Sequence, residues 1–206
     1  MKVRLGLVVT AVSTIAALMA PAADAGVLVN TAQSCDSQQL SQPFASFGDL
    51  AKYTPVPGGS FESGSAGWTL SGGAKVVSGN ETFQFRSAAD SHSLYLPQGA
   101  TAVSPSICVG LNEPTLRYFQ KQAGSLLGLT GAMSVDVLFE DSLGNVLSAP
   151  LLPGALTTGW QPGLPAPIVA NLLPLLPGQM TAVAFRFRAL TGNWNVDDVY
   201  VDPYCR

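Results

Sequence analysis

The sequence predicts an all-β fold, an antiparallel sandwich of two packed sheets, and two observations carry this prediction. Apolar and polar residues alternate with a period of two along several short segments, as expected for strands with one buried face. Gly and Pro, 21 and 15 of the 206 residues, separate many of these segments at short intervals. Short strands with such closely spaced turn signals are typical of sandwiches and barrels.

Two segments show the alternation most clearly. In residues 133–140, MSVDVLFE, one face consists of Met133, Val135, Val137 and Phe139. In residues 183–188, VAFRFR, the buried set is Val183, Phe185 and Phe187, which leaves Arg186 and Arg188 pointing outward. A slip of one position would bury both arginines, so the register of this strand is strongly specified.

The remaining strands follow from shorter patterns between turn residues. We expect them at residues 82–86, 93–96, 106–109, 115–121, 181–189 and 194–202, with a hairpin loop at 141–145 that leads into residues 146–147. Residues 68–71 and 74–77 flank Gly72-Gly73, a pair suited to a two-residue turn with positive φ, so we also expect a hairpin there.

The N-terminal residues have the pattern of an export signal. Lys2 and Arg4 precede an apolar run at residues 5–19, and the triplet Ala23-Asp24-Ala25 has small residues at the positions that signal peptidase reads. We expect cleavage after Ala25 and secretion of the mature protein. The run is shorter than the ~20 apolar residues of a spanning helix, so no membrane span is expected after signal removal.

After residues 1–25, the chain divides into an arm and one domain. Residues 26–57 are polar at first and end in a Pro- and Gly-rich stretch, which predicts an irregular N-terminal arm. Residues 58–206 are then the β-sandwich domain. Charged residues make up 11% of the chain, with 10 Lys and Arg against 13 Asp and Glu, so the sequence offers no basic field for nucleic acid.

Two phrases bracket most of the mature chain, residues 59–68, GSFESGSAGW, and residues 193–201, NWNVDDVYV. They resemble the corresponding phrases of the galactose-binding-like, jelly-roll carbohydrate-binding modules, and the whole chain resembles a family of secreted actinobacterial proteins. The resemblance implies a jelly-roll sandwich. In those modules an acidic residue of the first phrase and an aspartate of the last ligate a structural Ca²⁺ together with backbone carbonyls.

At the matching positions, the resemblance implies Glu62 and Asp198 as calcium ligands, with Asp197 facing the other way. Two carboxylates alone underfill the six to eight oxygen ligands that Ca²⁺ takes. The alternative is that Glu62 and Asp198 are solvated or pair with an arginine.

Sugar binding in such modules uses planar side chains that stack on pyranose rings and polar groups that bind hydroxyls. The outer sheet faces supply the candidates Arg117, Phe119, Asp136, Glu140, Arg186 and Arg188. Trp160, in a proline-rich loop, is expected to be an exposed stacking residue, whereas Trp68 and Trp194 are expected in the core. The alternative is that opposite charges on neighbouring strands only stabilise a solvated face.

Three cysteines, Cys35, Cys108 and Cys205, lie in the exported part, where disulfides persist. We expect Cys35 to pair with Cys108; Cys35 with Cys205, or three free thiols, are the alternatives.

Catalytic patterns are weak in this sequence. His92 is the one histidine, and no G-x-S-x-G elbow accompanies it. We therefore expect a non-enzymatic protein that binds a carbohydrate or the cell envelope, with a polysaccharide or cell-wall glycan as partner. The alternatives are a structural or protein-interaction component of the cell surface and a hydrolase that uses His92 or a carboxylate pair.

Overall fold

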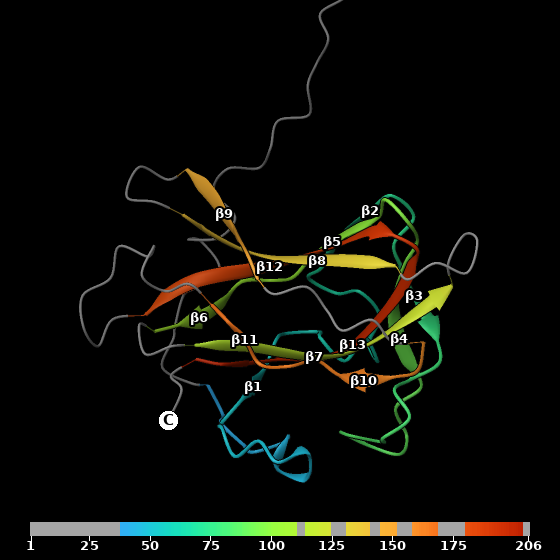
Figure 1. Cartoon of the computed structure of the whole chain (residues 1–206). Helices are drawn as coiled ribbons and strands as arrows, with labels where there is room; N and C mark the ends of the chain where they lie inside the picture. Colours follow the sequence, from blue (N-terminus) through green and yellow to red (C-terminus); the bar gives the residue numbers. More distant parts are fainter. Residues whose placement is uncertain are drawn as a thin grey trace, which may run out of the picture.

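The computed structural model describes residues 38–110, 114–124, 131–140, 145–151, 158–168 and 180–203. These residues form two antiparallel sheets packed face to face (Figure 1). One short 3-10 helix, η1 (Ala45–Phe47), is the only helix in this part of the chain. No helix within these ranges is long and apolar enough to cross a membrane. The predicted all-β antiparallel sandwich is therefore confirmed.

The first sheet has the strand order β10 (Gln161–Pro162), β7 (Thr115–Gly124), β13 (Asn193–Asp202), β4 (His92–Leu96) and β3 (Lys75–Ser78), with β1 (Thr54–Pro55) paired to β13 and β11 (Ala166–Pro167) paired to β7. The second sheet has the order β2 (Thr69–Ser71), β5 (Thr101–Val103), β12 (Thr181–Thr191), β8 (Ala132–Glu140) and β9 (Val146–Pro150), with β6 (Ile107–Val109) paired to β12. The chain crosses from one sheet to the other after β1, β2, β4, β6, β7, β9, β11 and β12, which is a jelly-roll arrangement.

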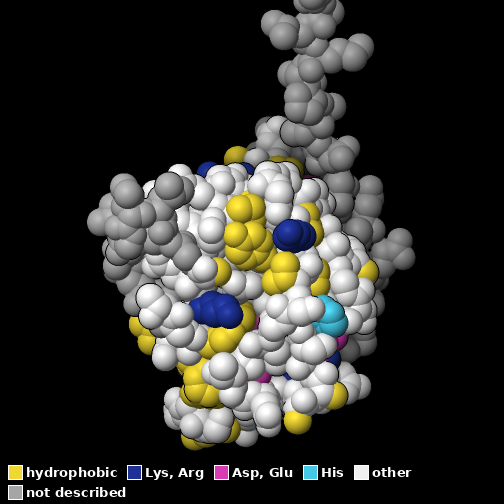
Figure 2. Space-filling model, turned by 90° about the vertical axis from the view of Figure 1, so that its right-hand side faces the viewer, with side chains coloured by type: hydrophobic (Ala, Val, Ile, Leu, Met, Phe, Trp, Pro, Cys, Tyr) yellow, Lys and Arg dark blue, Asp and Glu magenta, His cyan; other side chains and the backbone are white. Residues whose placement is uncertain are grey.

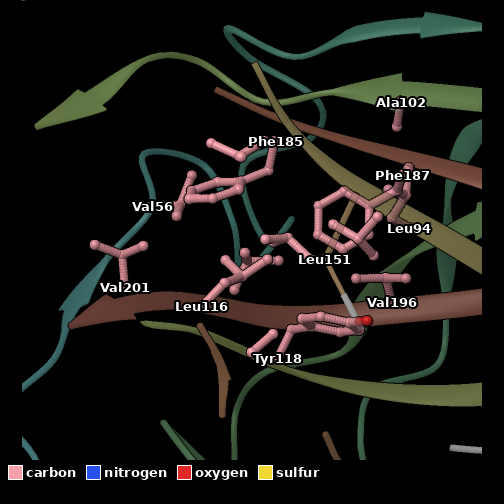
Figure 3. Close-up of a cluster of buried hydrophobic side chains, with 14 of the residues drawn as sticks. Val56, Leu94, Ala102, Leu116, Tyr118, Leu151, Phe185, Phe187, Val196 and Val201 are labelled. Atoms are coloured by element: carbon pink, nitrogen blue, oxygen red, sulfur yellow. The ribbon is translucent and has the colours of Figure 1, made fainter. Parts of the chain in front are cut away.

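The main core lies between the two sheets (Figure 3). The predicted inward residues of β8 and β12 all belong to it, so both period-two predictions are confirmed. Trp68 and Trp194 are also buried there, at 7% and 0% exposure, as expected.

The hairpin predicted around Gly72-Gly73 is wrong. β2 pairs with β5 in the second sheet, whereas β3 pairs with β4 in the first. Both glycines do have positive φ, 65° and 86°, but they carry the chain from one sheet to the other. Leu70 and Val76 pack against the same core from opposite sheets, and burying both is the physical reason for the crossing.

The strand predicted at residues 82–86 is a loop. Both carboxylate oxygens of Glu81 accept backbone N–H groups: Oε2 that of Phe83, and Oε1 that of Phe85 at 2.6 Å. Since the side chain of Glu81 takes the donors that a neighbouring strand would need, the segment has apolar alternation without strand pairing.

Residues 41–53 of the arm lie on the outer side of the first sheet, below β1 in Figure 1. An isolated bridge joins Ser41 to Tyr53, and Phe44 and Tyr53 are fully buried. With the loop after Glu81, this stretch builds a second core against the outer face of the sheet. Its members are Phe44, Tyr53, Phe119, Trp160 and Tyr200, with Phe47, Ala51 and Phe85 at its edge.

Candidate functional site

The second core buries the aromatic ligand candidates of the first sheet. Phe119 has 0% exposure and Trp160 only 6%, so the expectation that Trp160 is an exposed stacking residue is wrong. The ammonium of Lys121 lies 4.8 Å from the centre of the Trp160 ring. Trp160 belongs to the second core, together with Phe44 and Tyr53 of the arm.

Arg117 holds the arm onto this face. Its Nη1 donates to Asp49 Oδ2, its Nε donates to the carbonyl of Gly163 at 2.9 Å, and its guanidinium lies 4.3 Å from the centre of the Phe44 ring. Tyr53 also donates to Asp49, at 2.8 Å. Arg117 is thus an anchoring residue, and the structure does not present it to a ligand.

The outer face of the second sheet is different, because register aligns its outward side chains in two rows across the strands. One row consists of Ser71, Thr101, Arg188 and Ser134. The other consists of Thr69, Val103, Arg186, Asp136 and Pro150. We call these the polar rows. Thr69, Ser71 and Pro150 are exposed, and both arginines are half-buried.

Ion pairs join the centre of the polar rows. Arg186 donates to Asp136 Oδ2 from Nε at 3.0 Å and from Nη2 at 2.9 Å. Arg188 Nη2 lies 3.0 Å from the same oxygen, and its Nε donates to Ser134 at 3.2 Å. Glu140, the fourth charged candidate of this face, lies farther along β8 opposite Val146. The structure therefore brings Arg186, Arg188 and Asp136 together and leaves Glu140 apart.

A cavity of about 190 Å³ lies where β13 passes the start of the domain. Asp198 lines it together with Arg86, Tyr200 and residues 55–60. The backbone of Asp198 has φ 44°, and the pairing of β13 with β7 is interrupted between Asp197 and Tyr200. Both aspartates are buried, at 0% and 1% exposure.

The two aspartates differ in their partners. Asp197 accepts the backbone N–H groups of Asp198 and Glu81, at 2.8 and 3.3 Å. Among the described residues, neither carboxylate oxygen of Asp198 has a hydrogen-bond partner. Burial first, and the neighbouring carboxylates next, raise the pKa of Asp197 to about 9 and that of Asp198 to about 7. Glu81, itself 3% exposed, is one of those neighbours and was not singled out by the sequence pattern.

Glu62, the other predicted calcium ligand, is not among the residues that line the cavity. Its Oε1 accepts the backbone N–H groups of Ser91 and His92, at 2.9 and 2.7 Å. Burial favours the neutral acid, but these hydrogen bonds outweigh it and lower the pKa of Glu62. Within the described ranges, no three His, Cys, Asp or Glu side chains are grouped so as to hold a metal.

The geometry around His92 does not match a Ser-His-acid triad. Both Ser91 Oγ, at 3.0 Å, and Glu62 Oε2, at 3.2 Å, contact the same ring nitrogen, Nδ1. A triad needs the acid on one nitrogen and the serine on the other. The side chain of His92 is 41% exposed, and Figure 2 shows it in cyan at the surface.

Cys108 on β6 is disulfide-bonded. Cys35 and Cys205 both lie outside the described residues. Gln38 donates to the carbonyl of Cys108 at 2.9 Å, and the N–H of Gly110 donates to the carbonyl of Pro203 at 3.0 Å. Residues close in sequence to either cysteine thus lie beside β6, and pairing with Cys35 stays a prediction.

Comparison with known proteins finds similar solved structures. The chain is similar to the CBM22-1 xylan-binding domain of Xyn10C from Paenibacillus barcinonensis, at 17% identity and a TM-score of 0.45, over 71% of this chain and 93% of that one. It is similar to the CBM22-1-GH10 modules of Clostridium thermocellum xylanase 10B complexed with xylohexaose, at 14% identity and a TM-score of 0.49, over 69% of this chain and 27% of that one.

A third similar structure is the enzymatically active domain of tailspike protein 4 from bacteriophage CBA120, at 15% identity and a TM-score of 0.45. The match covers 70% of this chain and spans only 20% of the tailspike chain. Comparison with protein-family models finds no match, and neither does comparison with curated proteins.

Proposed function

We propose that this protein is a secreted, non-catalytic binding protein whose ligand is a carbohydrate, either a polysaccharide or a cell-wall glycan. The ligand lies across the polar rows of the second sheet. The observation that supports this most is the register of these rows, which aligns hydroxyl and guanidinium groups from three neighbouring strands, β5, β12 and β8. Thr69 and Ser71 of β2 extend the rows at the sheet edge.

The chemistry of the rows suits sugar hydroxyls. Serine and threonine hydroxyls both donate and accept hydrogen bonds, and arginine offers five donors in a planar fork. Adjacent strands lie about 4.8 Å apart, so successive groups of a row stand at a fixed spacing. The ion pairs with Asp136 hold both arginines in place before a ligand arrives, which lowers the entropic cost of binding.

A binding screen tests the proposal. The mature protein is applied to polysaccharides and purified cell-wall polymers, and retention is measured by affinity electrophoresis. The double variant Thr69→Val with Ser71→Ala removes two hydroxyls from the rows and should weaken binding about tenfold. Thr82→Val, an exposed threonine in the loop after Glu81, is the control and should bind as the wild type does. Retention by no polymer contradicts the proposal.

Secretion has its own test, because the export signal lies outside the described residues. The protein should appear in the culture medium of its producing cell with Gly26 as its first residue. An intact N-terminus found only inside the cell contradicts this part of the proposal.

We further propose that Asp198 binds a structural Ca²⁺. The unpartnered, buried carboxylate of Asp198 fits this role, since a buried charge without a hydrogen bond is costly unless an ion or a proton balances it. Ca²⁺ takes six to eight oxygen ligands, and residues 55–60 line the cavity beside Asp198. Glu62 remains the second carboxylate that the resemblance implies. The ion would neutralise the carboxylates and cross-link the start of the domain to β13.

Thermal unfolding in calcium and in chelator tests the metal site. An ion at about 100 times its Kd adds about 2.7 kcal/mol to the native state, so the melting temperature should rise in calcium. Asp198→Asn should abolish the difference, whereas Glu140→Gln, on the other sheet, should keep it. Glu62→Gln decides whether Glu62 is a ligand. Identical melting of the wild type in both conditions contradicts the site.

The alternative function, a structural or protein-interaction component of the cell surface, has a specific observation in its favour. Leu50 and Leu164 are 68% and 77% exposed. Each follows a residue that Arg117 binds, Asp49 and Gly163. Figure 2 also shows hydrophobic side chains gathered around two basic ones at one end of the sandwich. Binding to an envelope protein that is lost in a Leu50→Ser, Leu164→Ser variant, with no glycan retained, would favour this alternative.

A further inference from the structure

Two guanidinium groups share one carboxylate oxygen at the centre of the polar rows. Asp136 Oδ2 accepts both the Nε and Nη2 groups of Arg186 and lies 3.0 Å from Arg188 Nη2. The Asp136 side chain is only 6% exposed, whereas those of Arg186 and Arg188 are 29% and 41% exposed. The carboxylate thus lies beneath two cations that face the solvent.

The charges of this cluster do not balance. Two positive groups meet one negative group, and the other positions of the rows carry only uncharged side chains. Glu140, the nearest acidic residue along β8 on the same face, is two outward positions away from Asp136 and forms no ion pair with either arginine in the described part of the chain. The centre of the rows therefore has an excess positive charge.

Both arginines also keep unused donors. A guanidinium has five N–H donors, and the bonds to Asp136 and Ser134 involve only the Nε and Nη2 groups of each residue. Within the part of the chain that the structure describes, the Nη1 groups make no hydrogen bond and remain for a ligand. A planar guanidinium matches the geometry of carboxylate and phosphate oxygens, and its hydrogen bonds to anions are stronger than those to neutral groups.

We propose that Arg186 and Arg188 form an oxyanion subsite and that the ligand of this protein is an acidic glycan. The inference rests on the proposed carbohydrate binding and names its substrate class. The anionic group is a carboxylate of a uronic acid or a phosphodiester of the polymer backbone. Thr101 and Ser134, in the same row as Arg188, bind hydroxyls of the same sugar unit.

The experiment uses the mature protein and polymers that differ in charge. Polygalacturonate is compared with its carboxyl-reduced form, and poly(glycerol phosphate) is the phosphodiester probe. The acidic form of a polymer should bind at least about tenfold more tightly than the neutral form, and added salt should weaken it. Tight binding of polygalacturonate alone identifies a carboxylate ligand, and tight binding of poly(glycerol phosphate) alone identifies a phosphodiester.

Variants assign the effect to the two arginines. Arg188→Gln should bring the affinity for the acidic polymer down to that for the neutral one, while thermal unfolding stays near that of the wild type. Arg188→Lys keeps the positive charge but lacks the planar guanidinium, so it should recover only part of the preference for the acidic polymer. Lys75→Gln, an exposed cation on β3 of the first sheet, is the matched control and should keep the full preference.

Equal binding of acidic and neutral polymers overturns the inference and leaves carbohydrate binding standing. A preference that survives Arg188→Gln but is lost in Lys75→Gln also overturns it, because the charge then acts elsewhere. Retention of no polymer at all refutes both the inference and the proposed function.

Discussion

The outer faces of the two sheets carry similar residue types, yet the face of the first sheet is buried and that of the second is exposed to solvent. On the first sheet, the outward residues Arg117 and Phe119 of β7 are 5% and 0% exposed, because the arm and the loop after Glu81 cover them. On the second sheet, the side chains of Arg186 and Arg188 are 29% and 41% exposed. Strand alternation thus identifies which residues face away from the main core, but a separate segment decides whether water reaches them.

The ion pairs of the two faces differ accordingly. Arg117 joins a carboxylate of the arm, Asp49, to a carbonyl of the segment between β10 and β11, so its contacts hold separate pieces of chain together. Arg186 and Asp136 are register partners on neighbouring strands that are already paired through their backbones. The first pair joins separate segments, whereas the second joins strands that already pair and leaves the Nη1 groups of both arginines without a hydrogen bond among the described residues.

The largest effect expected from this comparison comes from the cover of the first sheet, by which we mean the arm and the loop after Glu81. Phe44→Ala removes a fully buried ring that contacts Phe119, Phe85 and Tyr200, so the free energy of unfolding should fall by about 3–5 kcal/mol. Denaturant unfolding measures this loss. A loss below about 1 kcal/mol would mean that the arm contributes little to the folded state, and the contrast between the faces would disappear.

A smaller effect separates the two arginines. Arg117→Ala leaves a partly buried Asp49 and the Gly163 carbonyl without their donor and should cost about 1.5–3 kcal/mol. Arg186→Ala leaves Asp136 paired with Arg188 and should cost less than about 1 kcal/mol. Both losses come from denaturant unfolding in one buffer. Equal losses would show that an ion pair beneath the cover stabilises the protein no more than one on the exposed sheet.

Acid should weaken the cover through Asp49. Burial raises its pKa, but hydrogen bonds from Tyr53, the Ala51 N–H and Arg117 outweigh burial and hold the pKa below the ordinary value of 3.8. A lowered pKa contributes stability that is fully present above pH 3.8 and is lost as the pH falls through the folded value. Unfolding measured between pH 6 and pH 3 should show a shallower decline in Asp49→Asn than in the wild type. Parallel declines would exclude Asp49 as a source of acid sensitivity.

The smallest effect is expected at the outside of the cover. Leu50 is 68% exposed although it belongs to the same arm as Phe44, so Leu50→Ser should change the free energy of unfolding by less than about 0.5 kcal/mol. A loss of 1 kcal/mol or more would indicate that Leu50 packs against a further surface in solution.

Local patterns predicted much of the sandwich correctly. The alternation in β8 and β12 is set by the two-residue period of a strand, so Val137 and Phe185 could be placed in the core without any partner being known. The same reasoning failed at Phe83 and Phe85, which also alternate, because a carboxylate two to four residues earlier captures their N–H groups. A capping side chain leaves no periodic signal.

The candidate site was less predictable than the fold. Arg186, Arg188 and Asp136 were expected on an outer face and are joined there, since register partners follow from strand pairing. Trp160 was misplaced, because it belongs to a second core whose members include Phe44 and Tyr53, more than a hundred positions earlier in the chain. The register shift of β13 beside Asp197 and the positive φ of Asp198 were not predicted, since strand alternation carries no signal for either.

The sequence by itself determined the strand pattern, the inward faces of β8 and β12 and the positive φ of Gly72 and Gly73, because these depend on neighbours within a few residues. Only the tertiary structure decided that the Gly72-Gly73 turn joins two sheets, that the arm covers the first sheet and that two arginines share Asp136 Oδ2. These outcomes depend on contacts between segments distant in the chain, and the side chain of one segment does not encode which distant surface will lie against it.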